Sequence, residues 1–312
     1  MKTRVYVDGY NLYYGCLKKT PYKWLDLVKL FELHLLPQAA PNQFSASAVS
    51  VKYFTADIKE QASFDETSLS DQNTYHRALE AIYPPEKLEI IKGYFSIADE
   101  FAFRINADDP KKPPKDCEKI KVWKLEEKQT DVNIAIHALY DVMTDSSLEH
   151  IVFVTNDTDL APVLKMIASL NRVAIGLIVP IKDKALRPAS TMLTEHASWC
   201  MSVIDEPSLK SSGLPRVVSH SVRHQKLRKA IVKPNGWFGQ KEIVEQVLNT
   251  LGEVLKGSGE KWQWLESPKP AVDDLPLLNT LPSELLDERE TALNVLAHAQ
   301  RYVSYMKNKS IK

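Results

Sequence analysis

Short apolar runs alternate with amphipathic segments over the first part of the chain, and this alternation constrains the fold more than any other feature of the sequence. Strand patterns occupy residues 4–7, 48–54, 88–95, 151–155 and 173–179, and helical spacing marks 24–36, 71–83, 131–143, 160–170 and 187–196. Strands that alternate with helices build βαβ units and a parallel sheet. With a short run at 202–204 as an edge strand, we expect a core sheet of five or six strands flanked by helices.

The pattern changes twice along the chain. The alternation breaks at residues 98–121, and within them residues 108–116 are polar, charged and rich in proline, so we expect an exposed loop at 108–116. From 207 to 241 the chain has no acidic residue, and helical patterns follow at 240–255 and 283–307. We therefore predict an α/β domain at residues 1–206, a basic linker at 207–239 and a small C-terminal helical module at 240–312.

The composition excludes few functions. The 312 residues include 40 basic and 40 acidic side chains, and a net charge of zero does not exclude nucleic acid as a partner. The three cysteines, Cys16, Cys117 and Cys200, are far apart and never in Cys-x-x-Cys spacing. We therefore expect neither a disulfide framework nor a cysteine zinc site. The sequence shows no signal peptide or membrane-spanning run, so we predict a cytoplasmic protein with no membrane partner.

Acidic residues stand where predicted strands end or predicted helices begin. Asp8 follows the first strand, Asp157 and Asp159 follow a buried strand, and Asp131 begins a helix. Ligand sites of open parallel sheets form at the carboxyl ends of strands, and carboxylates gathered there repel one another unless a cation lies between them. Oxygen ligands alone favour Mg²⁺ or Mn²⁺, which activates water for phosphodiester hydrolysis. Asn11, one helical turn beyond Asp8, can orient its carboxylate or a metal-bound water.

Each of these residues also has a simpler interpretation. Asp8 and Gly9 together form a common turn sequence. Asp131 follows Thr130 at what can be an ordinary helix start, where an acidic residue is favoured by the helix dipole. The segment 156–159 can cap the helix that follows it. The residues alone therefore make the metal site a hypothesis, with a structural alternative at each position.

Three segments together resemble the motifs of NYN domains, a group within the PIN-like nuclease superfamily. VYVDGYNL at residues 5–12 resembles the opening D-x-x-N motif, and EKQTDVNIA at 127–135 resembles the central E-K-x-x-D-V-x-x-A motif. VTNDTDLAPV at 154–163 resembles the third motif, in which two aspartates flank a serine or threonine ahead of a proline. The three motifs occur in the order and at separations plausible for NYN domains. The sequence RPAS at 187–190, with Leu193, resembles the segment that follows the last core strand in the bacterial DUF88 branch. The resemblance covers about residues 1–206.

This resemblance implies a PIN-like, Rossmannoid fold and a ribonuclease that hydrolyses RNA phosphodiester bonds with Mg²⁺ or Mn²⁺. It implies a catalytic set in which four aspartates bind the metal and an asparagine supports them: Asp8, Asp131, Asp157, Asp159 and Asn11. Many NYN domains have a further aspartate in the helix after the central motif, and the residue here is His137. We interpret His137 either as a packing residue or as a residue that supports the metal ligands without binding the metal.

RNA would also need cationic contacts to its phosphates. The predicted contacts are one lysine beside the central motif and four cations of the basic stretch: Lys128, Arg223, Lys226, Arg228 and Lys229. Several aromatic side chains can stack on unpaired bases, among them Tyr10, Tyr13, Tyr14, Trp237 and Phe238. We therefore expect single-stranded or structured RNA as a partner, with a solvated linker as the alternative for the basic stretch. A homodimer is compatible with the sequence.

Two other classes of function compete with the ribonuclease. One is an RNA-binding or scaffold protein with an inactive NYN site, although retention of all four aspartates favours the nuclease. The other is an NADH-dependent hydroxypyridine monooxygenase, because such a label is attached to some chains of this branch. The sequence supports it less: no G-x-G-x-x-G follows the first strand, and Gly257 and Gly259 lie in a polar turn without a third glycine.

Overall fold

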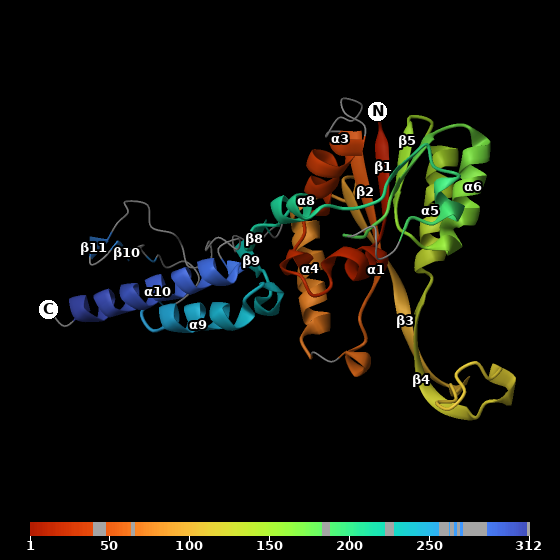
Figure 1. Cartoon of the computed structure of the whole chain (residues 1–312). Helices are drawn as coiled ribbons and strands as arrows, with labels where there is room; N and C mark the ends of the chain where they lie inside the picture. The colour runs from red at the N-terminus through yellow and green to blue at the C-terminus, as the bar shows by residue number, and fades with distance from the viewer. Residues whose placement is uncertain are drawn as a thin grey trace.

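A seven-stranded sheet forms the centre of the molecule, with the strand order β4-β3-β2-β1-β5-β6-β7 (Figure 1). The computed structural model describes residues 1–39, 48–63, 66–182, 188–221, 228–255, 262, 265–266, 269–270 and 286–310. The strands are β1 (Thr3–Asp8), β2 (Val49–Ala56), β3 (Leu88–Phe103), β4 (Lys119–Lys128), β5 (His150–Val154), β6 (Ala174–Ile178) and β7 (Trp199–Met201). All neighbours pair in parallel except β3 and β4. The predicted α/β class and mostly parallel sheet are confirmed.

Helices cover both faces of this sheet (Figure 1). On one face lie α1 (Gly9–Leu12), the π-helix η1 (Tyr13–Leu17), α2 (Leu27–Lys29), the π-helix η3 (Leu30–Leu35), α3 (Leu36–Ala39) and α4 (Ser68–Ile82). On the other lie α5 (Thr130–Thr144), α6 (Ala161–Leu170) and the short α7 (Thr191–Thr194). Short 3₁₀ turns connect them at η2 (Pro21–Lys23), η5 (Glu60–Ala62), η6 (Pro114–Asp116) and η7 (Thr158–Leu160).

The alternation of side chains along the central strand β1 divides the interior into two cores. Val5 and Val7 pack with Phe31 of the first helical layer, whereas Tyr6 packs with Ile134 and Leu164 of the second. Successive side chains of a strand point to opposite faces, so a strand buried on both sides reads as a continuous apolar run. The three-layer arrangement therefore follows from the apolar runs seen in the sequence.

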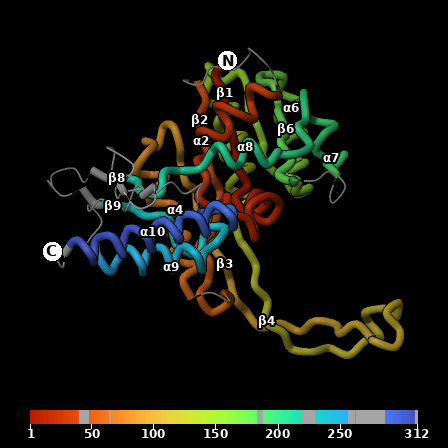
Figure 2. Tube along the Cα trace, turned by 60° about the vertical axis from the view of Figure 1, so that its left-hand side comes forward, coloured from red at the N-terminus to blue at the C-terminus, as the bar shows by residue number. Residues whose placement is uncertain are grey.

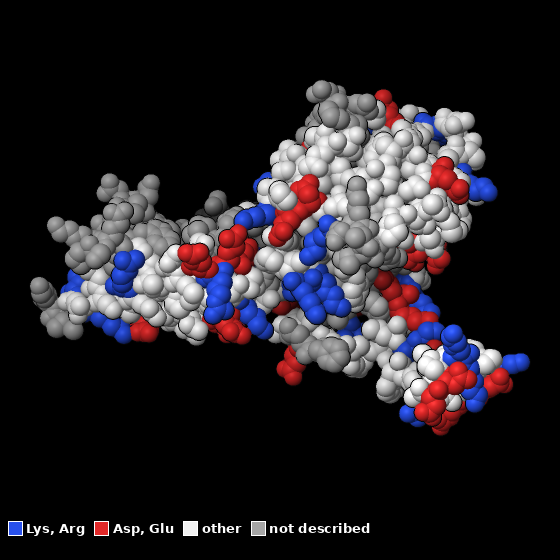
Figure 3. Space-filling view, in the orientation of Figure 1, with Lys and Arg blue, Asp and Glu red and all other residues white. Residues whose placement is uncertain are grey.

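The predicted exposed loop at residues 108–116 is confirmed, but the residues before and after it form a hairpin that the sequence did not predict. Strand β3 continues to Phe103, and β4 returns beside it from Lys119, in register from Tyr94 opposite Lys128. The hairpin projects from the body of the molecule as an arm (Figure 2), and acidic and basic side chains are intermixed on it (Figure 3). Cross-strand ion pairs such as Lys124 with Glu100 stabilise the hairpin. The charged residues on either side of the loop therefore belong to solvated strands.

The last strand of the sheet also differs from the prediction. The edge strand is β7, so the predicted strand at 202–204 is displaced by three residues, and the predicted helix at 187–196 is reduced to α7. Residue 187 of that helix lies outside the described residues. Gly176 of β6 pairs with Trp199, and a Cβ on Gly176 would lie 2.2 Å from the indole ring. The absence of a side chain at Gly176 lets the indole lie flat over β6 and sets the register of β7.

The stretch at 207–239 contains the helix α8 (Glu206–Ser211), the hairpin β8 (Val217–Ser221) and β9 (Arg228–Val232), and the turn η8 (Asn235–Trp237). Beyond it α9 (Lys241–Gly252) and α10 (Arg289–Ser310) lie side by side (Figure 1) and share a separate core. Two short strands, β10 (Leu265–Glu266) and β11 (Lys269–Pro270), lie between α9 and α10 in the sequence and pair with each other in antiparallel fashion. No helix in the described part of the chain is both long and apolar enough to cross a membrane.

Candidate functional site

The predicted site residues meet at the carboxyl edge of β1 and β5, where the strand order changes direction. Asp8 ends β1 and is buried, with only 4% of its surface exposed. Its carboxylate accepts hydrogen bonds from the Asn11 backbone N at 2.9 Å, from Asn11 Nδ2 at 2.7 Å and from Thr155 Oγ1 at 3.0 Å. Asn11 thus holds Asp8, as predicted from its spacing. Burial raises the pKa of Asp8, although these hydrogen bonds oppose the shift.

Asp157 and Asp159 follow β5 and belong to the turn η7. The backbone N of Asp159 donates to Asp157 Oδ1 at 3.0 Å, and the backbone N of Asp157 donates to Thr155 Oγ1 at 3.0 Å. Asp157 therefore caps the turn, which is the simpler interpretation considered for this segment. Thr155 connects this turn to β1 through its hydrogen bond with Asp8.

Glu127 and Asp131 complete the edge from the junction of β4 and α5. Gln129 has φ 73°, a left-handed conformation that turns the chain directly from β4 into α5. Burial raises the pKa of Glu127 to about 7, with further contributions from the charges of Asp8 and Asp131. Burial likewise raises the pKa of Asp131 to about 6, and the charges of Asp8, Asp157 and Asp159 add to the effect. The charges of these carboxylates therefore act on one another. We call the group the carboxylate edge; it consists of Asp8, Glu127, Asp131, Asp157 and Asp159.

The predicted metal site at this edge is wrong. In the part of the chain that the structure describes, no group of three or more His, Cys, Asp or Glu side chains converges so that it could hold a metal ion. The physical reason lies in the hydrogen bonds: Asp8 already accepts from Asn11 and Thr155, and Asp157 accepts from the backbone of η7. Carboxylates used in this way hold the backbone of the edge in place.

Burial of the carboxyl groups at the carboxylate edge, together with their mutual repulsion, makes the protein's stability depend on pH. A carboxyl group whose pKa is raised on folding favours the native state while protonated, so its contribution is lost as pH rises through about 6 to 7. We expect Asp131→Asn to raise the free energy of unfolding at pH 8 by about 1 kcal/mol, allowing for solvent screening. Near pH 4 the gain should vanish. Urea unfolding at both pH values tests this, with Asp108→Asn on the arm as a neutral control; equal stability of the Asp131 variant and wild type at pH 8 would contradict the expectation.

Three of the five predicted RNA-contacting cations belong to the described residues, and they lie on two different strands. Lys128 ends β4 and forms an ion pair with Glu126. Arg223 and Lys226 lie outside the described residues, and Arg228 and Lys229 belong to strand β9.

Two other basic residues of the stretch at 207–241 are buried. Arg216 is 8% exposed and Lys233 is 4% exposed, and Lys233 Nζ lies 4.2 Å from the centroid of the Phe238 ring. These two cations therefore serve the interior of the protein and do not form a phosphate-binding surface.

His137 lies apart from the carboxylate edge. Its Nδ1 is 3.3 Å from Lys52 Nζ, and its ring packs edge-on against Phe54 at 5.6 Å between ring centroids. Burial and the charge of Lys52 lower the pKa of His137. These contacts agree with the prediction that His137 is a packing residue.

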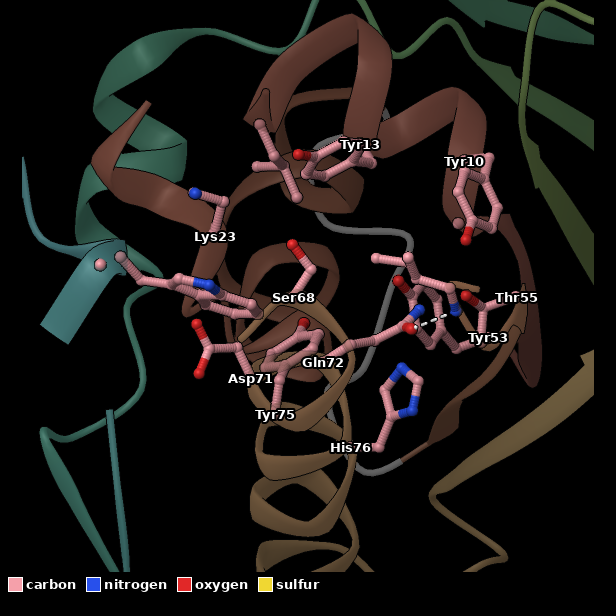
Figure 4. Close-up of a pocket in the computed structure, with 15 residues that line it drawn as sticks. Tyr10, Tyr13, Lys23, Tyr53, Thr55, Ser68, Asp71, Gln72, Tyr75 and His76 are labelled. Carbon is pink, nitrogen blue, oxygen red and sulfur yellow. Dashed lines mark hydrogen bonds between the residues drawn. The ribbon is translucent and has the colours of Figure 1, made fainter. Parts of the chain in front are cut away.

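An aromatic cavity of about 130 Å³ adjoins the carboxylate edge (Figure 4). Its walls come from α1, η1, β2 and α4, and the turn η8 of the C-terminal part closes it. The residues that give it its character are aromatic: Tyr10, Tyr13, Tyr53, Tyr75, His76 and Trp237. Sequence reasoning considered Tyr10, Tyr13 and Trp237 as stacking residues, but it missed His76, Tyr53 and Tyr75, because residues far apart in the chain meet here.

The turn after Asp8 joins the cavity to the carboxylate edge. Gly9 lines the cavity, and a Cβ at this position would lie 2.5 Å from the backbone oxygen of Phe54 and 2.8 Å from the Tyr53 ring. Only glycine allows this close approach. Burial raises the pKa of the Tyr53 hydroxyl, and the charges of Asp8 and Glu127 raise it further. Tyr53 therefore lines the cavity and is also affected by the charges of the carboxylate edge.

Comparisons with known proteins give one extensive similarity. The chain is 37% identical to 6-hydroxy-3-succinoylpyridine 3-monooxygenase HspA of Pseudomonas putida (strain DSM 28022 / S16) over 312 residues, which cover 97% of this chain and 95% of the relative. No family model matches the chain. A solved structure of a protein of unknown function from Vibrio parahaemolyticus RIMD 2210633 matches 65% of this chain and 93% of its own, with 15% identity and a TM-score of 0.35. A structural likeness this weak supports no conclusion.

The similarity to HspA overturns the predicted activity. A monooxygenase is an oxidoreductase, so the prediction of a ribonuclease is wrong, together with the predictions of RNA binding as its function and of Mg²⁺ or Mn²⁺ as its cofactor. The hydroxypyridine monooxygenase, considered as an alternative, is the better interpretation. RNA as a partner and a homodimer stay predictions.

Proposed function

The chain belongs to the protein family of this Pseudomonas putida monooxygenase, and we propose that it inserts one oxygen atom from O₂ into a hydroxypyridine. The observation that carries the proposal is the extent of the similarity, which spans almost the whole of both chains. The part of this chain that the similarity covers includes the α/β domain, the carboxylate edge, the cavity and the C-terminal helices. The substrate class follows from the relative's name, which describes a pyridine with a hydroxyl group on carbon 6 and a succinoyl group on carbon 3.

The overall reaction must balance atoms and electrons. One atom of O₂ enters the substrate and the other leaves as water, which takes two electrons from a reductant and consumes one proton. The relative's name places the oxygenation on carbon 3, so the bond from that carbon to the succinoyl group breaks. The succinoyl group leaves as a carboxylic acid if water adds to it, or as an aldehyde if a second reductant molecule supplies two more electrons. A reduced nicotinamide is a reductant of the required two-electron class and leaves in its oxidised form. The chain therefore has to bind a flat heteroaromatic ring, exclude bulk water from it and supply a proton.

Glu127 is the residue that we propose for proton transfer. Its pKa of about 7 keeps it partly protonated at neutral pH, which suits a group that exchanges a proton with the reactants. Its Oε1 accepts a hydrogen bond from Thr130 Oγ1 at 2.5 Å, which fixes the orientation of the carboxyl group. Perturbed pKa values of this kind gather at functional sites, and the charge of Glu127 also acts on Tyr10 and Tyr53 in the cavity wall.

The carboxylate edge does not fit a tightly bound flavin or nicotinamide dinucleotide. Such cofactors place their phosphates on a glycine-rich turn after the first strand, at the start of a helix. Here that turn holds the buried carboxylate of Asp8, and α1 has four residues. The negative charges of Glu127, Asp131 and Asp157 would repel a phosphate further. Gly257 and Gly259 lie outside the described residues. We therefore assign no step to a bound dinucleotide and propose that the reduced nicotinamide acts as a co-substrate.

We also propose that the α/β domain has the PIN-like fold of NYN domains. The three sequence motifs support this proposal, since they supply Asp8, Asn11, Asp131, Asp157 and Asp159, which the structure brings to one edge of the sheet. A shared fold does not require a shared reaction, because function depends on the site that a fold carries. In this chain the carboxylates would hold the edge together and supply a proton for oxygenation.

The proposed function is tested by incubating the purified protein with 6-hydroxy-3-succinoylpyridine, NADH and O₂. We expect oxygen uptake and NADH oxidation that depend on the substrate, with one hydroxylated product formed per O₂ consumed. Omitting each reactant in turn gives the controls. NADH oxidation at the same rate without the pyridine, and no new product, would count against the proposal.

A further inference from the structure

We infer that the aromatic cavity binds the pyridine ring of the substrate and that His76 recognises the edge of the ring that carries the nitrogen and the hydroxyl group. This inference rests on the proposed function and names the part of the site that selects the substrate. Its starting point is a buried polar side chain that has no hydrogen-bond partner among the described residues.

His76 is buried on α4, with 3% of its surface exposed, and lines the cavity. Neither of its ring nitrogens has a hydrogen-bond partner among the described residues. Buried polar groups are nearly always hydrogen-bonded, because an unsatisfied one is costly. An unpartnered imidazole in a cavity wall is therefore explained if a ligand supplies the missing partner. Figure 4 shows His76 beside Tyr53 and Gln72 on the cavity wall.

The protonation state of His76 suits a hydroxypyridine. Burial lowers the pKa of His76 to about 4, with a further contribution from the charge of Lys92, so the imidazole is neutral at physiological pH. A neutral imidazole has one donor and one acceptor nitrogen. A pyridine with a hydroxyl group next to its nitrogen also presents one donor and one acceptor, in either of its tautomers. Through one ring nitrogen at a time, His76 can therefore donate to the acceptor or accept from the donor of this edge in either tautomer, without taking up or releasing a proton.

The walls of the cavity fit a flat, uncharged ring. His76 packs against Tyr53 and Tyr75, with ring centroids 6.1 and 6.0 Å apart, and Trp237 lies 5.7 Å from Tyr75. The hydroxyl group of Tyr75 donates to the Leu25 backbone oxygen at 2.7 Å, so Tyr75 presents its ring to the cavity. An apolar cavity of about 150 Å³ is known to hold a benzene ring, so a volume of about 130 Å³ is of the right order for one pyridine ring.

The polar groups elsewhere on the wall do not demand a charged ligand. Lys23 and Asp71 both line the cavity and have opposite charges. Figure 4 shows Lys23 on one side of the cavity and Tyr53 and Thr55 on the opposite side. Lys23 Nζ lies 5.5 Å from the centroid of the Trp237 ring. Because Trp237 comes from η8 beyond the α/β domain, the cavity is complete only when the C-terminal part is in place. This explains why the similarity to the relative includes that part of the chain.

The test is a binding cycle that changes the protein and the ligand separately. Calorimetry without O₂ or reductant measures the dissociation constants of 6-hydroxy-3-succinoylpyridine and of 3-succinoylpyridine, which lacks the hydroxyl group. We expect the wild-type protein to bind the hydroxylated ring about ten-fold more tightly, as one buried hydrogen bond allows. His76→Leu should lose most of this preference, and His76→Gln, which restores a donor and an acceptor, should regain part of it.

A purely structural role for His76 predicts a different pattern. Replacing an unpartnered buried imidazole by leucine should leave the melting temperature unchanged or raise it, so weaker binding cannot be ascribed to unfolding. His150 is the matched control: it is also buried, but Trp199 Nε1 donates to its Nε2 at 3.1 Å. His150→Leu should lower the melting temperature and leave the ligand preference intact.

The outcomes separate this inference from the proposed function. Loss of the preference in His76→Leu supports the inference, whether or not the protein turns the ligand over. An unchanged preference in His76→Leu would overturn it even if the wild-type protein forms product. Turnover by wild type without measurable binding to the free protein would also overturn it, because the cavity would then not hold the ring by itself. Absence of both binding and turnover would remove the inference and the proposed function together.

Discussion

Replacing Glu127 by glutamine is expected to lower kcat for 6-hydroxy-3-succinoylpyridine by a factor of about 10² to 10⁴, the range that a single proton-transfer residue contributes. Glutamine keeps the size of the side chain and can still accept from Thr130 Oγ1, but it cannot exchange a proton. The wild-type rate should fall as pH rises through about 7, because the carboxyl group that donates the proton becomes ionised. The variant should lack this dependence.

The neighbouring Glu126 provides the control. It lies on the same strand and forms ion pairs with Lys124 and Lys128, so Glu126→Gln changes the same charge one residue away. We expect kcat of this variant to stay within about two-fold of wild type, because exposed ion pairs contribute little. A Glu127 variant with wild-type kcat and an unchanged pH profile would remove Glu127 from the mechanism without affecting the substrate assignment.

The largest effect on stability is expected from Asp141, on α5. Its carboxylate is 8% exposed and lies 3.0 Å from Arg4 Nη1 and 2.7 Å from Lys52 Nζ, and the hydroxyl group of Tyr6 donates to it at 2.8 Å. Asp141→Asn would leave two partly buried cations without their common anion. Breaking a buried ion pair in this way costs about 3–5 kcal/mol of unfolding free energy.

Asp145, one helical turn further along, is the matched comparison. It pairs with Lys2 at 2.9 Å and with Arg4 at 3.3 Å, but it is more exposed at 21%. We expect Asp145→Asn to lose about 1 kcal/mol or less. Urea denaturation of both variants at pH 7 measures the difference. Equal losses in the two variants would show that burial does not determine the strength of this network.

The sheet was predictable because its central strands are buried on both faces. The apolar runs at 4–7, 151–155 and 173–179 correspond to β1, β5 and β6, and each end of each strand differs from the prediction by one residue. The arm was not predictable in the same way, because its strands leave the sheet and face water on both sides. Their stabilisation comes from cross-strand charges, such as Lys121 with Asp99, which resemble a solvated loop in the sequence.

The site could be predicted only in part. Asp8, Asp131, Asp157 and Asp159 act on one another electrostatically, as the ends of parallel strands suggested. Their spacing could not reveal that hydrogen bonds from the backbone and from Thr155 occupy two of them, Asp8 and Asp157. A cluster of aspartates therefore suggested a metal that the geometry does not support.

No sequence motif indicated the roles that we propose for Glu127 and His76. Glu127 begins the central motif, but its pKa depends on burial and on carboxylates from other strands. His76 lies on an ordinary helical pattern, and its lack of a partner is visible only when β2, α4 and η8 are assembled. Such features depend on contacts between distant segments, which a single sequence does not record.

The most direct test of the central claim is a reaction under ¹⁸O₂ with purified protein, NADH and 6-hydroxy-3-succinoylpyridine, followed by mass spectrometry of the product. A monooxygenase places one labelled oxygen atom in each product molecule and the other in water. We predict this result for the wild-type protein and a strong loss of labelled product for Glu127→Gln. A product that takes its oxygen from H₂¹⁸O, or no product at all, would contradict the assignment of this chain as a hydroxypyridine monooxygenase.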